Sequence, residues 1–265
     1  MFEWLLPIFG FLISIAASLT GIGGGTFIVP LLALLYNFEP VVAIGTSTTT
    51  IVITSIMSAI SYLRQGRVYV KAGLVLACAT APGAYLGAAI TAVPAVKMRL
   101  GVIFGILLII VAFQMVYKAF STKSVRGCGV ADPVFERELL KNWKKMLRGL
   151  CLSFLGGIAS GMLGIGGGVV LVPVMCYALS FPIFFAIPTS MFIMIFTSMS
   201  GAASHIQQGN VNGIYAIYLG VGAVVGAYVG AYISRKFSSR GLSLAFAAML
   251  LVASINMIMK NLQYV

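Results

Sequence analysis

Two glycine runs interrupt apolar segments of this chain, and they constrain its possible folds more than any other feature. Residues 21–25 read Gly-Ile-Gly-Gly-Gly, and residues 164–168 repeat this pattern at an offset of 143 residues. Glycine loses more backbone entropy on ordering than other residues and readily adopts left-handed dihedral angles, so a continuous helix is unfavourable at both runs. We therefore expect each apolar segment to break into two half-helices. In lipid, such a break is tolerated only where protein or a wet cavity surrounds it.

Composition assigns the chain to the membrane proteins. Its residues are 60% hydrophobic and only 8% charged, and the mean hydropathy is +1.07. The net charge of +12 would suggest a nucleic-acid partner in a soluble protein. Here the basic residues flank apolar spans, so we expect the lipid bilayer and no nucleic acid as partner. The four cysteines lack metal-ligand spacing, so neither a metal site nor a cofactor is expected.

The order of the apolar segments predicts four membrane elements in the first half. A helix broken at the glycines is followed by three segments long enough to cross a bilayer. We place these elements at residues 4–36, 41–62, 71–92 and 97–118. The expected organisation is a first transmembrane repeat over 1–118, a polar connection over 119–148 and a second transmembrane repeat over 149–265.

The second half repeats the first without a gap. Matches at the same offset include Gln65 with Gln208 and Tyr85 with Tyr228. The predicted fold class is thus an all-α polytopic membrane protein with two homologous four-element repeats, each opening with a glycine-broken helix.

Basic residues bear on whether these repeats run parallel or inverted. Both arrangements place most Lys and Arg residues on one side of the membrane. The distribution of basic residues therefore does not choose between them. The loop after residue 62 carries Arg64, Arg67 and Lys71, whereas the matching loop carries no charge at these positions. Such a loss is expected when equivalent loops face opposite compartments, so we favour inverted repeats.

The polar connection contains a segment with helical amphipathicity. Over residues 134–148 apolar side chains fall near helical spacing with charged side chains opposite them. We interpret this segment as one interfacial helix anchored by Trp143. It serves either as a plain connector or in regulation by lipid or a partner.

The glycine runs occur with a second paired motif. Each run is followed by an Ala-Ile-x-Thr-Ser segment, at Ala43 to Ser47 and at Ala186 to Ser190. With these pairs the chain resembles the TauE/SafE family of sulfite and organosulfonate transporters over nearly its whole length. The resemblance implies a secondary transporter of the cell membrane that moves a small sulfur-containing anion, is not an enzyme, and forms a homodimer.

The residues themselves agree with an anion as substrate. A half-helix that begins after a glycine run presents unpaired N–H groups and a partial positive charge. Hydroxyl groups donate to an anion without the desolvation cost of a buried cation. The alternative is that glycines and hydroxyls serve helix packing. The candidate substrate-binding residues are Gly23, Gly24, Gly25, Thr26, Thr46, Ser47, Gly166, Gly167, Gly168, Thr189 and Ser190.

Three polar residues near the ends of spans are candidates for a gate or a proton sensor: Arg64, His205 and Gln207. His205 is the only histidine, and its side chain has an unperturbed pKa near 6.5. The alternatives are a water-facing helix end for His205 and a membrane anchor for Arg64.

Rival functions lack their chemistry. An intramembrane protease needs a Ser-His pair in a suitable context or two membrane aspartates, and Asp132 in the connection is the only Asp. An ion channel or cation carrier, the main alternative, needs carboxylates or a carbonyl filter, and no predicted span contains Asp or Glu.

Overall fold

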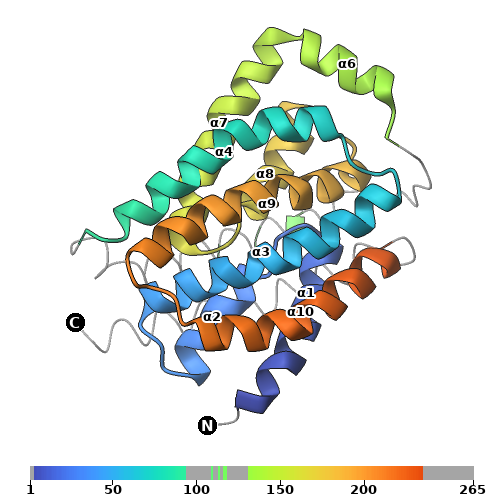
Figure 1. Cartoon of the computed structure of the whole chain (residues 1–265). Helices are drawn as coiled ribbons and strands as arrows, with labels where there is room; N and C mark the ends of the chain where they lie inside the picture. Colours follow the sequence, from blue (N-terminus) through green and yellow to red (C-terminus); the bar gives the residue numbers. More distant parts are fainter. Residues whose placement is uncertain (1–2, 94–108, 110–112, 114–115, 118–130, 235–265) are drawn as a thin grey trace.

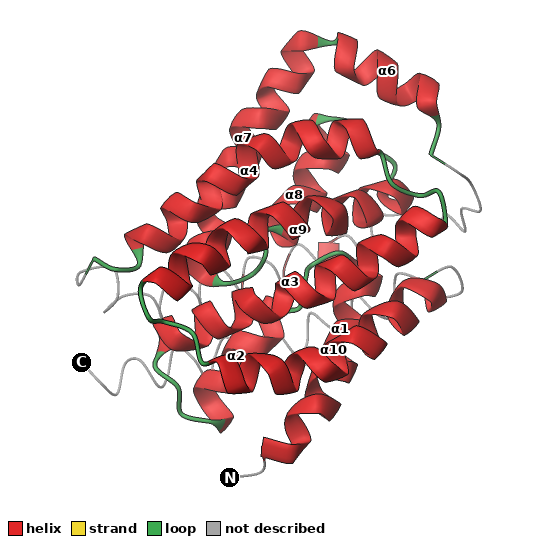
Figure 2. Cartoon of the chain, in the orientation of Figure 1, coloured by secondary structure: helices red, strands yellow, loops and turns green. Residues whose placement is uncertain are grey.

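The computed structural model describes residues 3–93, 109, 113, 116–117 and 131–234. Within these residues every regular element is a helix (Figure 2), so the predicted all-α class is confirmed for this part of the chain. The predicted span at 97–118 falls almost entirely outside the described residues. In chain order the elements are η1 (Glu3–Leu5), α1 (Leu6–Thr20), α2 (Gly25–Leu35), α3 (Pro40–Arg64), α4 (Val70–Ile90), α6 (Pro133–Lys141), α7 (Trp143–Leu163), α8 (Gly168–Pro173), η2 (Val174–Ala178), α9 (Ile183–Gln207) and α10 (Gly213–Ile233).

Five of the described helices are long and apolar enough to cross a membrane, namely α3, α4, α7, α9 and α10. Each has 21 or 25 residues. At 1.5 Å per residue these lengths correspond to about 32 to 38 Å, and the hydrocarbon core of a bilayer is about 30 Å thick. The protein is therefore a multi-pass membrane protein. The spans predicted at 41–62 and 71–92 are confirmed as α3 and α4.

Helices α3 and α9 lie side by side at the centre of the described structure (Figure 1). They run in opposite directions, as their colours in Figure 1 show. Helix α4 packs against α7 and α9, and α10 packs against α1 and α3. The short helices α2 and α8 contact α3 and α9 respectively. The glycine breaks that precede these short helices therefore adjoin the central pair.

Small residues bring the outer helix pairs into close contact. A Cβ atom added at Gly87 of α4 would overlap the carbonyl oxygen of Ile158 in α7, and one added at Gly226 of α10 would overlap that of Phe11 in α1. Such approach between backbones is typical of membrane helix pairs, which gain van der Waals contact and no hydrophobic driving force from association. Tyr85 and Tyr228 in the same segments are partly exposed.

The single amphipathic helix predicted over 134–148 is wrong: the structure has two helices there. Helix α6 ends at Lys141, and α7 begins at Trp143 and continues as a membrane-spanning candidate. Asn142 separates them with a non-helical ψ of 84° and accepts a hydrogen bond from the Lys145 N–H at 3.2 Å. Asparagine favours such capping positions because its side chain substitutes for a missing backbone partner.

The apolar side of α6 faces other helices of the protein. Leu139 is buried, and the ring of Phe135 lies 5.5 Å from that of Tyr69, which directly precedes α4. The Glu136 carboxylate accepts a hydrogen bond from the Ala72 N–H at 2.9 Å. These contacts fix α6 to the corner between α3 and α4.

Candidate functional site

Both glycine runs break the chain where the sequence predicts. Gly21 ends α1 with a φ of 75°, and Gly23 and Gly24 follow with φ values of 93° and 89°. In the second run Gly164, Gly166 and Gly167 have φ values of 66°, 81° and 91°. An L-residue rarely adopts these angles, so glycine is required for the backbone path. The short helices begin immediately afterwards, at Gly25 and Gly168.

The two breaks touch each other. A Cβ atom on Gly25 would overlap the carbonyl oxygen of Gly164, and a Cβ atom on Gly168 would overlap that of Gly21. Every residue of both runs is buried. The break in each half therefore packs against the break in the other half, deep in the protein.

Two serines donate hydrogen bonds to backbone carbonyl groups of these breaks. The Ser47 hydroxyl donates to the Gly164 carbonyl at 3.0 Å. The Ser190 hydroxyl shares its proton between the Gly21 carbonyl at 3.1 Å and the Ile187 carbonyl of its own helix at 2.8 Å. A hydroxyl has one proton, so neither serine can donate to an anion while these bonds persist. This geometry gives Ser47 and Ser190 a positioning role for the breaks.

The neighbouring threonines accept hydrogen bonds from the residues just before two helices. The Thr46 hydroxyl accepts a hydrogen bond from the Asn212 N–H at 3.0 Å, and the Thr189 hydroxyl accepts one from the Tyr69 N–H at 3.1 Å. Asn212 and Tyr69 are the residues that precede α10 and α4. Both bonds link a central helix to a helix of the other half, and both threonine oxygens act as acceptors in them.

The start of α2 combines free donors of two kinds. No side chain caps this helix at Gly24, so the N–H groups of Gly25 and Thr26 lack helical partners, whereas the Phe27 N–H donates to the Gly24 carbonyl at 3.0 Å. Thr26, at the second position of α2, is completely buried, and its hydroxyl has no hydrogen-bond partner. Helix α8 is also uncapped but spans only six residues, and Val169 occupies the matching position. The structure thus singles out the α2 end as the polar side of the paired breaks.

In the part of the chain that the structure describes, no acidic side chain is buried near these donors. Among the described residues, the buried polar or charged side chains include no Asp, Glu or Lys, and Arg67 is the one arginine. Arg67 lies in the α3–α4 corner, where its guanidinium donates to the Phe184 carbonyl at 3.1 Å. The N-termini of α2 and α8 therefore supply the positive partial charges at the breaks, where the C-terminal ends of α1 and α7 supply the negative ones.

Comparison with known proteins agrees with this architecture. The family model described as "Sulfite exporter TauE/SafE" matches residues 6–257. The chain belongs to the TauE/SafE family. It is 30% identical to "Probable membrane transporter protein YunE" of Bacillus subtilis (strain 168), over 97% of this chain and 98% of that protein. It is 28% identical to "Probable membrane transporter protein MJ0441" of Methanocaldococcus jannaschii, over 80% of this chain and 76% of that protein. No solved structure matches the chain significantly.

The three candidate gate residues of this TauE/SafE protein do not lie at the glycine breaks. Arg64 and Gln207 are exposed at the last residues of α3 and α9. Met194, which contacts the breaks, precedes Gln207 by about 20 Å along the α9 axis. Gln207 accepts a hydrogen bond from the Tyr85 hydroxyl at 2.7 Å.

His205 departs from the expectation of a water-facing helix end. Its side chain is completely buried, and its Nε2 lies 3.0 Å from the Gly161 carbonyl oxygen. The N–H form of Nε2 donates to this carbonyl, which leaves Nδ1 as an acceptor without a partner. The matching Tyr62 donates from its hydroxyl to the Ser18 carbonyl at 2.7 Å. Packing of α9 against α7 buries the histidine although the helix ends two residues later.

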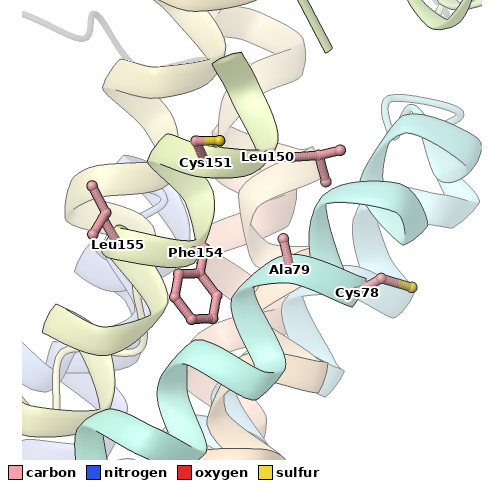
Figure 3. A pocket seen from close by; sticks show the side chains of 6 residues that line it. All are labelled: Cys78, Ala79, Leu150, Cys151, Phe154 and Leu155. Atoms are coloured by element: carbon pink, nitrogen blue, oxygen red, sulfur yellow. The ribbon is translucent and has the colours of Figure 1, made fainter. Parts of the chain in front are cut away.

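A separate pocket in this TauE/SafE protein lies between α4 and α7 (Figure 3). Its volume is about 550 Å³, and the described residues that line it are Cys78, Ala79, Leu150, Cys151, Phe154 and Leu155. These side chains are apolar or thiols and include no hydrogen-bond donor suited to an oxyanion. The pocket is distinct from the paired glycine breaks.

Sequence reasoning missed one residue that the structure places at the breaks. Met194 in the middle of α9 contacts both glycine runs. An apolar residue in an apolar span carries no local signal of such a position, and its counterpart at the repeat offset, Ile51, is different in shape.

Proposed function

We propose that this protein is a secondary transporter of the cell membrane that moves a small sulfur-containing anion, of the sulfite or organosulfonate type, through a site between its two halves. One observation carries this proposal. The uncapped start of α2, with the buried and unpartnered Thr26 hydroxyl, lies against the glycine break of the other half.

The donors at this site suit an oxyanion. Backbone N–H groups and the positive end of a helix dipole attract negative charge, and the absence of a Cβ atom at the glycines lets a ligand approach the backbone. We assign the N–H groups near Gly23, Gly24 and Gly25 and the Thr26 hydroxyl as direct donors. Gly166, Gly167 and Gly168 complete the site from the other half.

The two Thr-Ser pairs then position the site through hydrogen bonds to the backbone. Ser47 and Ser190 fix the carbonyl ends of the breaks, and Thr46 and Thr189 fix the starts of α10 and α4. We propose that these four residues position the donors, and that an anion competes for the Ser47 and Ser190 hydroxyl protons only when the breaks separate.

We further propose that the halves are inverted repeats. The opposite directions of α3 and α9 support this (Figure 1). Reciprocal hydrogen bonds at the repeat offset support a two-fold relation between the halves, which inverted and parallel repeats share: the Gln65 Nε2 donates to the Ala231 carbonyl at 3.1 Å, and the Gln208 Nε2 donates to the Ala88 carbonyl at 3.0 Å. Inverted halves that meet at one site provide two similar conformations, one open to each side of the membrane. The homodimer is part of the same proposal and rests on the family resemblance.

The test is transport by the purified protein in proteoliposomes. Radiolabelled sulfite, sulfate, thiosulfate and an organosulfonate are supplied separately, with protein-free liposomes as the control. We expect uptake of at least one sulfur-containing anion, competition by the others, and no uptake of a monovalent metal cation when the anion is absent. Cation uptake without anion uptake would overturn the proposal in favour of the channel or cation-carrier alternative.

A further inference from the structure

Met194 fills the space between the two glycine breaks. Its terminal methyl group occupies the side of Gly23 and of Gly166 on which other residues carry a Cβ atom. Its sulfur lies close to Gly168 as well. The side chain is completely buried. One methionine from α9 thus contacts the break in its own half and the break in the other half.

The corresponding residue in the first half does less. Ile51 of α3 lies at the repeat offset from Met194, and its Cγ2 atom adjoins Gly166. A β-branched side chain in a helix is largely restricted to one χ1 rotamer. Methionine is unbranched and has three rotatable side-chain bonds, so it can leave a space and refill it. Of the two matching residues, only Met194 combines the central position with this freedom.

Any ligand that approaches the backbone at Gly23 or Gly166 from the open side of the glycine must displace the Met194 methyl group. We propose that Met194 is a movable stopper of the anion site, and that the room it vacates sets the size of the anion admitted. This inference rests on the proposed function, since it assigns a size-selecting residue to that site.

The first experiment measures size selectivity by direct binding. Purified wild type, Met194→Ala and Met194→Leu variants are compared for their affinities for sulfite and for a bulky aromatic sulfonate. Met191→Ala is the matched control, because Met191 is an equally buried methionine of α9 that is not among the nearest neighbours of either glycine run. Variants are compared only where they remain monodisperse in detergent.

Truncation of Met194 should shift the affinity ratio toward the bulky sulfonate by about tenfold or more, the usual effect of pocket-size changes of this order. Met194→Leu should keep the ratio near that of wild type because its volume is similar. Met191→Ala should leave the ratio unchanged. Equal ratios in Met194→Ala and Met191→Ala would overturn the assignment.

The second experiment does not depend on the substrate. In a background without the four native cysteines, Met194→Cys and Met191→Cys are treated with the anionic reagent sulfonatoethyl methanethiosulfonate. We expect modification at position 194 and none at position 191. Equal lack of reaction at both positions would overturn the stopper. If wild type binds no sulfur-containing anion, the substrate class fails, and this labelling still decides whether position 194 opens to a small anion.

Discussion

Replacing Thr26 by valine should stabilise the empty protein and weaken anion binding. The Thr26 hydroxyl is completely buried without a hydrogen-bond partner, and an unsatisfied polar group of this kind costs about 1–3 kcal/mol. Valine has nearly the same shape, and the matching position in the other half already carries Val169. Removing the hydroxyl should therefore raise the free energy of unfolding by about 1 kcal/mol, at the low end of that range.

The affinity for the anion should fall in the same variant. A hydrogen bond to a charged group contributes about 1.5–3 kcal/mol, which corresponds to roughly tenfold to a hundredfold in affinity. The melting temperature of the anion-free protein in detergent should rise by about 2–4 °C, and the dissociation constant of the anion should increase. Calorimetry or a scintillation proximity assay on the same preparation measures this dissociation constant.

Thr197→Val is the matched control. The Thr197 hydroxyl is equally buried, but it lies 2.9 Å from the Thr80 hydroxyl and 3.2 Å from the Ile193 carbonyl. Its loss should lower the melting temperature, because side-chain hydrogen bonds inside membrane proteins contribute about 0.6 kcal/mol on average. Anion affinity should stay unchanged. If Thr26→Val lowers the melting temperature as Thr197→Val does, or binds the anion like wild type, the assignment of Thr26 as a free donor is refuted.

Four further predictions follow from the same contacts. Gly24→Ala should destabilise the protein by about 1–2 kcal/mol through its positive φ, and Gly25→Ala by about 3 kcal/mol because the new Cβ atom overlaps the Gly164 carbonyl; equal melting temperatures would contradict this order. Arg67→Ala should lower the free energy of unfolding by about 2–4 kcal/mol, because the guanidinium stacks 3.6 Å from the Phe184 ring centroid and donates hydrogen bonds to Ser234 and Phe184. Arg64 is exposed, so Arg64→Ala should change the free energy of unfolding by less than about 0.5 kcal/mol. Inverted repeats predict that an impermeant thiol reagent labels Arg64→Cys and Gln207→Cys from opposite sides of the membrane in a cysteine-free background, and labelling from one side would establish the parallel arrangement. His205→Gln keeps a side-chain N–H for the Gly161 carbonyl but does not titrate, so a proton-sensing role predicts loss of the transport response to a pH gradient, and an unchanged response excludes that role.

Local sequence determined the backbone of this protein well. The breaks at residues 21–25 and 164–168 follow from glycine, because positive φ values are a property of single residues. The spans follow from the length of apolar segments, because the bilayer sets a minimum of about 20 residues. The prediction of one helix over 134–148 was wrong because the apolar periodicity continues through Asn142, whereas a local capping hydrogen bond ends the helix there.

Tertiary structure alone decided which polar groups are free. Ser47 and Thr26 look equally suited to an anion in the sequence, but the Ser47 proton binds a carbonyl 117 residues away, whereas the Thr26 hydroxyl has no partner. His205 and Met194 likewise owe their burial and their contacts to helices distant in the chain. The conformation of a residue is set mainly by its neighbours within a few positions, so the sequence reveals it. The partner of a hydroxyl or a methyl group depends on how whole helices pack, and only the folded protein determines that.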